Sequence, residues 1–122
     1  MSDEDWPLLC FLFLDPENRL VHSHACEPDE TGWITFPDSV FIRQRKPGGF
    51  GQVGERLFRR VHKRGWLKRV NIIDYGSKIG PQDEYQLSDA AIHRFKNDTA
   101  WQRELFRWQQ VVNSVRRERA AA

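Results

Sequence analysis

The strongest constraint on the fold is an apolar repeat with helical spacing near the C terminus. Trp101, Leu105, Trp108, Val112 and Val115 recur at positions i, i+4, i+7, i+11 and i+14, which places them on one face of a helix. Such a helix is stabilised mainly by burial of its apolar face, so the rest of the chain must supply an apolar surface for it to pack against.

Short apolar segments separated by turn residues predict an antiparallel sheet before this helix. Asp15-Pro16-Glu17-Asn18 is typical of a tight turn, because proline fits the second position and asparagine tolerates left-handed backbone angles. The turn is expected to join its two flanking segments into a hairpin. The predicted strands are Leu8–Leu14, Leu20–Cys26, Trp33–Phe36, Val40–Gln44 and Lys68–Asp74.

Two further helices are expected. Gln52–Arg64 carries Leu57 and Val61 near one face, and Gly65 after it is a residue that often ends helices. A shorter helix is expected after Ser88, whose side chain can cap it.

The remaining segments are expected to be irregular. Tyr75–Gln86 contains two glycines and a proline and is predicted to be a loop, Asn97-Asp98 to separate the last two helices, and Arg116–Ala122 to fray. With 122 residues, one compact domain is the default. The prediction is an α+β fold, in which a small antiparallel sheet with an N-terminal hairpin or meander carries a central basic helix and a C-terminal amphipathic helix.

Charge is distributed unevenly along the chain, although the net charge is only +2. Residues 1–38 hold nine acidic and one basic residue, residues 39–69 hold ten basic and one acidic, and the remainder is nearly balanced. This asymmetry indicates a polyanionic partner for the middle third, or pairing of the acidic and basic regions within the fold.

The basic segment 43–69 predicts a contact with nucleic acid. Arg56, Arg60 and Lys63 recur at i, i+4 and i+7, opposite the apolar face of the predicted helix. A helix that carries such like charges close together, despite their repulsion, is typical of a surface that binds phosphates. The alternative is a solvated face. The candidate contact residues are Arg43, Arg45, Lys46, Arg56, Arg59, Arg60, Lys63, Arg64 and Lys68.

A glycine motif precedes this helix. Gly49, Gly51 and Gly54 in GFGQVG fit G-x-G-x-x-G, and Asp74 follows Gly54 by 20 residues. The stretch 49–74, GFGQVGERLFRRVHKRG…VNIID, resembles the first βαβ unit of the Rossmann domains of bacterial potassium-channel regulators. The resemblance implies a dinucleotide site in which Asp74 meets a ribose hydroxyl. A basic stretch separates the preceding strand from the first glycine, and no further βαβ unit follows. We therefore favour a loop that only begins the helix, and we expect no bound cofactor.

The sequence VHSHAC places His22, His24 and Cys26 on the same face of a strand. In the expected hairpin Cys10 lies opposite His24, so four zinc-type ligands would share that face. Neighbouring side chains along one strand lie ~6–7 Å apart, so a tetrahedral site would need the sheet to curl. We favour the alternative that Cys10 is buried as an apolar residue and the histidines are partly exposed.

The common enzyme signatures G-x-S-x-G, P-loop G-K-[ST], H-E-x-x-H and C-x-x-C are absent from the sequence. The longest apolar run, Pro7–Leu14, is far shorter than a membrane span and follows acidic residues, so neither a membrane partner nor a signal peptide is expected. Two cysteines fit a reducing, cytoplasmic setting.

These observations favour a small non-enzymatic module that binds nucleic acid or associates with nucleoprotein. The alternative is a protein-interaction module, an inhibitor or regulatory adaptor that uses its charge polarity and exposed aromatic side chains, with a nucleic-acid-binding protein as partner. The wide apolar stripe of residues 101–115 leaves a homodimer through this helix as a further option.

Overall fold

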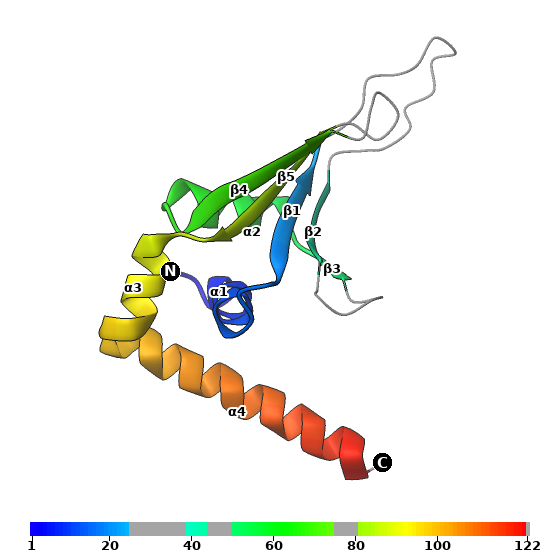
Figure 1. The fold of residues 1–122 in the computed structure, drawn as a ribbon. Helices are drawn as coiled ribbons and strands as arrows, with labels where there is room; N and C mark the ends of the chain where they lie inside the picture. The colour runs from blue at the N-terminus through cyan, green and yellow to red at the C-terminus, as the bar shows by residue number, and fades with distance from the viewer. Residues whose placement is uncertain (25–38, 44–49, 75–80, 122) are drawn as a thin grey trace.

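The computed structural model describes residues 1–24, 39–43, 50–74 and 81–121, which form an α+β fold (Figure 1). This fold class is the one predicted from the sequence. The elements within these residues are, in chain order, α1 (Asp5–Leu14), β1 (Arg19–Ser23), β2 (Ser39–Arg43), β3 (Phe50–Gln52), α2 (Glu55–Lys63), β4 (Leu67–Asp74), β5 (Pro81–Leu87), α3 (Asp89–Asn97) and α4 (Thr99–Ala121).

The strands form one antiparallel sheet in the order β3-β2-β1-β5-β4. The central strand β1 pairs Leu20 with Ile42 of β2 on one side and with Tyr85 of β5 on the other. The predicted strands 20–26, 40–44 and 68–74 are confirmed as β1, β2 and β4, each within a few residues of the expected bounds, whereas the predicted strand 33–36 lies outside the described residues.

The prediction of a strand over Leu8–Leu14 is wrong, because this segment lies within helix α1. A short, uniformly apolar run has no periodicity that separates a buried strand from a buried helix. Pro7 is tolerated because it lies in the first turn, where backbone N–H groups have no helical partner. Leu8, Leu9, Cys10 and Leu12 are buried, so about half of the helix circumference packs against the rest of the molecule. The predicted hairpin between this segment and β1 therefore does not exist.

The prediction of a loop over Tyr75–Gln86 is also wrong in its second part, because residues from Pro81 onward form β5. The sequence PQDEYQL contains two acidic residues of low strand propensity. β5 is nevertheless paired on both sides, with β1 and β4, so ladder hydrogen bonds and burial outweigh its local preference. The consequence is that Asp83 and Glu84 are buried in the middle of the sheet.

The core lies on one face of the sheet, beneath α1 and α2. Directly paired residues of antiparallel strands point to the same side, so the register places Leu20, Ile42 and Tyr85 on a common face. Leu20 and Tyr85 pack in one cluster with Leu9 of α1 and with Phe58 and Val61 of α2. Both helices therefore cover the same face of the sheet.

The last two helices begin where the sequence predicts. Ser88 caps α3, since its Oγ accepts the Ala91 N–H at 3.2 Å, and the Oδ1 atom of Asp98 accepts the Ala100 N–H at 2.9 Å at the start of α4. Trp101 attaches α4 to the body through edge contacts with Trp6 and Trp66, whose ring centroids lie 5.1 and 4.9 Å away. From there α4 runs away from the sheet to the C terminus (Figure 1), and it stays helical through Ala121. Fraying of residues 116–122 stays a prediction.

Candidate functional site

The predicted basic helix is present as α2, and its ends follow the local sequence. The helix begins after Gly54, and the Val53 N–H group donates to the Val40 carbonyl at 2.9 Å, which ties the start of the helix to β2. It ends at Lys63, and Gly65 two residues later has a positive φ of 81°, as expected of a glycine that follows a helix. Phe58 and Val61 are buried against the sheet, so the opposite side of the helix faces outward.

The outward side of α2 and the residue after it carry exposed cations: Arg56, Arg59, Lys63 and Arg64. We call these four residues the outer basic face. Arg59 is partly neutralised, because its Nη2 atom donates to Oε1 of Glu55, one turn earlier, at 2.5 Å. For the other three, no ion pair with a carboxylate occurs among residues 1–24, 39–43, 50–74 and 81–121.

Arg60 differs from the four residues of the outer basic face, because its side chain is paired within the fold. Its Nε and Nη2 atoms donate to Oδ1 of Asp5 at 2.9 and 2.6 Å, and the Asp5 side chain is fully buried. The hydrogen bonds to Asp5 raise the pKa of Arg60 above its ordinary value, and the nearby charges of Asp5 and Glu4 act in the same direction. Arg60 therefore joins α2 to α1. At this position the acidic N-terminal region and the basic region pair within the fold.

Two other predicted contact residues lie on the opposite side of the sheet from α2. Arg43 pairs with Phe50 and Arg19 in the register and makes an ion pair with the buried carboxylate of Glu84. Lys68 is the register partner of Gln86, and its Nζ atom lies 3.7 Å from Asp89 at the start of α3. The basic residues of segment 43–69 therefore do not form one continuous surface. Arg45 and Lys46 lie outside the described residues.

The glycine motif does not have the arrangement that its local resemblance implies. Gly51 lies in β3, opposite Ile42, and Gly54 precedes α2. The strands before and after α2, β3 and β4, occupy the two opposite edges of the sheet, whereas the first two strands of a Rossmann unit are adjacent. Asp74, at the end of β4, is therefore separated from the glycines by the width of the sheet. Gly49 lies outside the described residues.

The structure brings His22 and His24 together, as their alternation predicts, and adds a residue that the sequence did not indicate. Their ring centroids lie 4.3 Å apart, and the His24 Nε2 atom lies 2.7 Å from Oδ2 of Asp83. One possible ligand atom from each of the three residues falls within 4.8 Å of the others. Asp83 is 59 positions away from His24 in the sequence. A loop is predicted there from the sequence, although the alternation of Asp83, Tyr85 and Leu87 is a signal that could have indicated a strand.

The two cysteines of the predicted four-ligand set do not join this cluster in the described structure. Cys10 is a fully buried residue of α1, and it was predicted to lie opposite His24 only because α1 was taken as a strand. Burial raises the pKa of its thiol to about 12, with a smaller contribution from the charge of Glu104. Cys10 is therefore a packing residue, as the favoured alternative predicted. Cys26 lies outside the described residues.

Aromatic side chains surround the histidine cluster on the α2 side. The ring of Phe58 lies 5.1 Å from that of His22 and 5.3 Å from that of Tyr85, and His62 lies 5.2 Å from Tyr85. Burial raises the pKa of the Tyr85 hydroxyl, and the charge of Asp83 raises it further. The cluster therefore has an apolar wall made by the sheet-facing side of α2.

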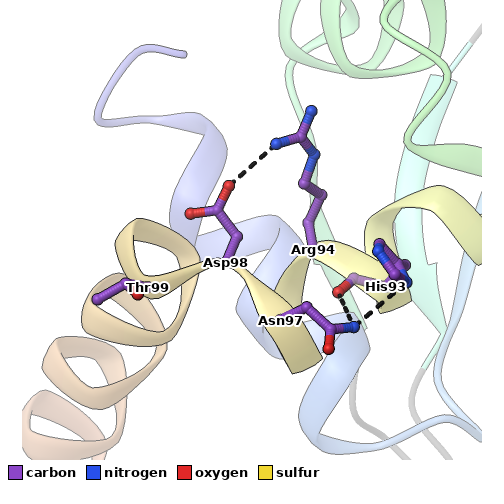
Figure 2. A pocket seen from close by; sticks show the side chains of 5 residues that line it. All are labelled: His93, Arg94, Asn97, Asp98 and Thr99. Atoms are coloured by element: carbon purple, nitrogen blue, oxygen red, sulfur yellow. Dashed lines mark hydrogen bonds and ion pairs between the residues drawn. The ribbon is translucent and has the colours of Figure 1, made fainter.

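A depression of about 540 Å³ lies at the junction of α3 and α4 (Figure 2). Its polar side chains bond to one another: Arg94 donates to Asp98 at 3.0 Å, and Asn97 donates to the His93 carbonyl at 3.0 Å. The Arg94 hydrogen bond holds the pKa of Asp98 below its ordinary value. Asp98 links the two helices, because its other carboxylate oxygen accepts the Ala100 N–H at the start of α4.

Comparison of the chain with models of known protein families, with characterised proteins and with solved structures gave no significant match. Among the helices in the described part of the chain, none combines the length and the apolar character needed to span a membrane.

Proposed function

We propose that the protein binds nucleic acid through the phosphate backbone, using the outer basic face of α2. The observation that carries this proposal is that Arg56, Lys63 and Arg64 are exposed and have no carboxylate partner among the described residues. A cation that is already paired inside the fold gains little binding free energy from a phosphate. An unpaired surface cation that binds a phosphate displaces condensed counterions, and their release favours binding.

The proposed contact surface includes fewer cations than the segment 43–69 that the sequence predicts. Arg60 is held by Asp5, and Arg43 is held by Glu84, so neither cation is expected to contribute directly. Arg59 can exchange its exposed partner Glu55 for a phosphate at small cost, because surface ion pairs contribute only about 0–1 kcal/mol. Four cations around one helix suit recognition of the backbone rather than the bases.

The test is fluorescence anisotropy at low salt with a short labelled duplex DNA and a labelled single-stranded RNA. The double change Arg56→Glu, Lys63→Glu should weaken binding at least about tenfold, because two phosphate contacts are replaced by repulsion. The matched control is Arg103→Glu, Arg117→Glu, which makes the same change of net charge on exposed positions of α4.

The result that supports the proposal is a large loss in the α2 variant and a small loss in the α4 variant. Equal losses would mean that only net charge matters, and that α2 is not the binding surface. No binding by the wild-type protein at low salt would refute the proposal outright.

A protein-interaction function is the second candidate, and the outer side of α4 supports it. Phe106 is 61% exposed and Val111 is 55% exposed, although Trp101 on the inner side of the same helix is buried. Exposed apolar groups on a helix that extends from the body suit a protein contact, including a homodimer through residues 101–115. Sedimentation equilibrium of wild-type protein and of Phe106→Ser would detect it, because a dimer through this face should dissociate in the variant.

A further inference from the structure

The sheet holds two histidines and one carboxylate in a fixed arrangement that does not depend on the nucleic-acid proposal. His22 of β1 and Asp83 of β5 are direct register partners, so their side chains leave the sheet on the same side. His24 follows two residues after His22. Its backbone N–H group donates to the Pro81 carbonyl at 3.1 Å, and this hydrogen bond continues the pairing with β5. The backbone of two neighbouring strands therefore positions all three side chains.

The distances suit a single bound ion. The three ligand atoms lie within 4.8 Å of one another, and the His24 Nε2 and Asp83 Oδ2 atoms are 2.7 Å apart. Ligand atoms bonded to one zinc ion at about 2.0–2.2 Å lie roughly 3 Å from each other. Small side-chain rotations would therefore bring the three ligand atoms to these distances.

The electrostatic surroundings favour a cation. The Asp83 side chain is only 10% exposed, and its one ion-pair partner among the described residues is His24. A buried carboxylate is costly unless it is paired, and a divalent ion would compensate it while both imidazoles act as neutral ligands. The Phe58 ring beside His22 limits water on one side of the cluster.

We propose that His22, His24 and Asp83 bind one divalent transition-metal ion, with zinc as the first candidate. Two imidazole nitrogens and one carboxylate oxygen form a ligand set that suits zinc and other first-row transition metals, whereas calcium and magnesium favour oxygen ligands throughout. Three protein ligands leave at least one coordination position for water or another small ligand.

Calorimetric titration of the chelator-treated full chain with zinc chloride tests this site. One zinc ion should bind per chain. Asp83→Asn keeps the shape of the side chain but removes its charge, and zinc affinity should fall at least about 100-fold, because even loss of an outer partner costs about 10–100-fold. The control is His93→Ala on the exposed side of α3, which should bind zinc as the wild type does.

Imidazole resonances of the wild-type protein give a second measurement that requires no variant. The chain has four histidines, and zinc should shift the signals of His22 and His24 while leaving His93 in place. Absence of saturable zinc binding would overturn the proposal. Equal loss of affinity in Asp83→Asn and His93→Ala, or zinc shifts confined to other histidines, would do the same.

Discussion

Arg56 and Arg60 lie one turn apart on the same helix, yet they have different surroundings. Arg60 turns toward α1 and donates two hydrogen bonds to the buried carboxylate of Asp5, while Arg56 is exposed. In the sequence the two arginines belong to one i, i+4, i+7 row. A row of cations on a helix therefore cannot be taken as one binding surface, because a single buried acceptor can pair one of them within the fold.

The largest effect is expected where the inner side of α2 meets α1. Asp5→Ala removes the acceptor of the Arg60 side chain and of the Ser2 N–H group, which donates to the other carboxylate oxygen at 3.2 Å. The free energy of unfolding should fall by about 1–3 kcal/mol, because hydrogen bonds that involve a charged group contribute up to about 3 kcal/mol each. Urea denaturation followed by circular dichroism measures it.

The matched control is the preceding residue. Glu4 is 80% exposed and lies 3.6 Å from Arg60, so Glu4→Ala should change the free energy of unfolding by less than about 0.5 kcal/mol. Similar losses in the two variants would show that Arg60 does not depend on the buried carboxylate.

The rate at which the Cys10 thiol is alkylated reports local opening of α1. This thiol is fully buried and its pKa is raised to about 12, so iodoacetamide should react with it slowly at neutral pH. Asp5→Ala should accelerate the reaction about 5- to 100-fold, because local opening becomes more populated in proportion to the lost stability. Peptide mass spectrometry separates Cys10 from Cys26. Fast alkylation in the wild type would contradict the packing of α1.

A smaller effect is expected at the end of α2. Gly65 has a φ of 81°, a conformation that side chains disfavour, and no atom lies within 4 Å of an added Cβ. Gly65→Ala should therefore cost about 1 kcal/mol from backbone strain alone. Gly54, at the other end of the helix, also has open space for a Cβ, but its φ is negative. Gly54→Ala should therefore lower the thermal unfolding midpoint less than Gly65→Ala does.

The smallest effect on stability should come from the outer side of α2. Arg56→Gln with Lys63→Gln should change the free energy of unfolding by no more than about 0.5 kcal/mol, with slight stabilisation at low salt, because repulsion between like charges is removed. A loss comparable to that of Asp5→Ala would mean that these cations have partners within the fold, and the contrast between the two sides of α2 would disappear.

The parts of the fold that follow local rules were predictable from the sequence. Gly65 ends α2, Ser88 caps α3 and Asp98 separates α3 from α4, because each effect is decided within a few residues. Helix α1 and strand β5 were not predictable in this way. The run Pro7–Leu14 is apolar on all sides, and β5 depends on pairing with strands that are distant in the sequence.

The same distinction applies to the candidate sites. The common face of His22 and His24 follows from their spacing, whereas Asp83 joins them only through the pairing of β1 with β5. The basic character of α2 is visible in the sequence, but the pairing of Arg60 with Asp5 is not. Asp5 lies 55 positions away, at the start of a helix whose later residues were predicted to form a strand. Contacts between residues that are distant in the sequence therefore determine which of the predicted site residues lie close together.

The salt dependence of DNA binding tests whether the outer basic face of α2 contacts phosphates. If the four residues of the outer basic face neutralise phosphates, the logarithm of the association constant should fall with the logarithm of salt concentration at a slope of about −3 to −4. Arg56→Gln with Lys63→Gln should make the slope shallower by about 2, while Arg103→Gln with Arg117→Gln should leave it unchanged. A slope that is the same in all three proteins would contradict the assignment of this face as the nucleic-acid contact.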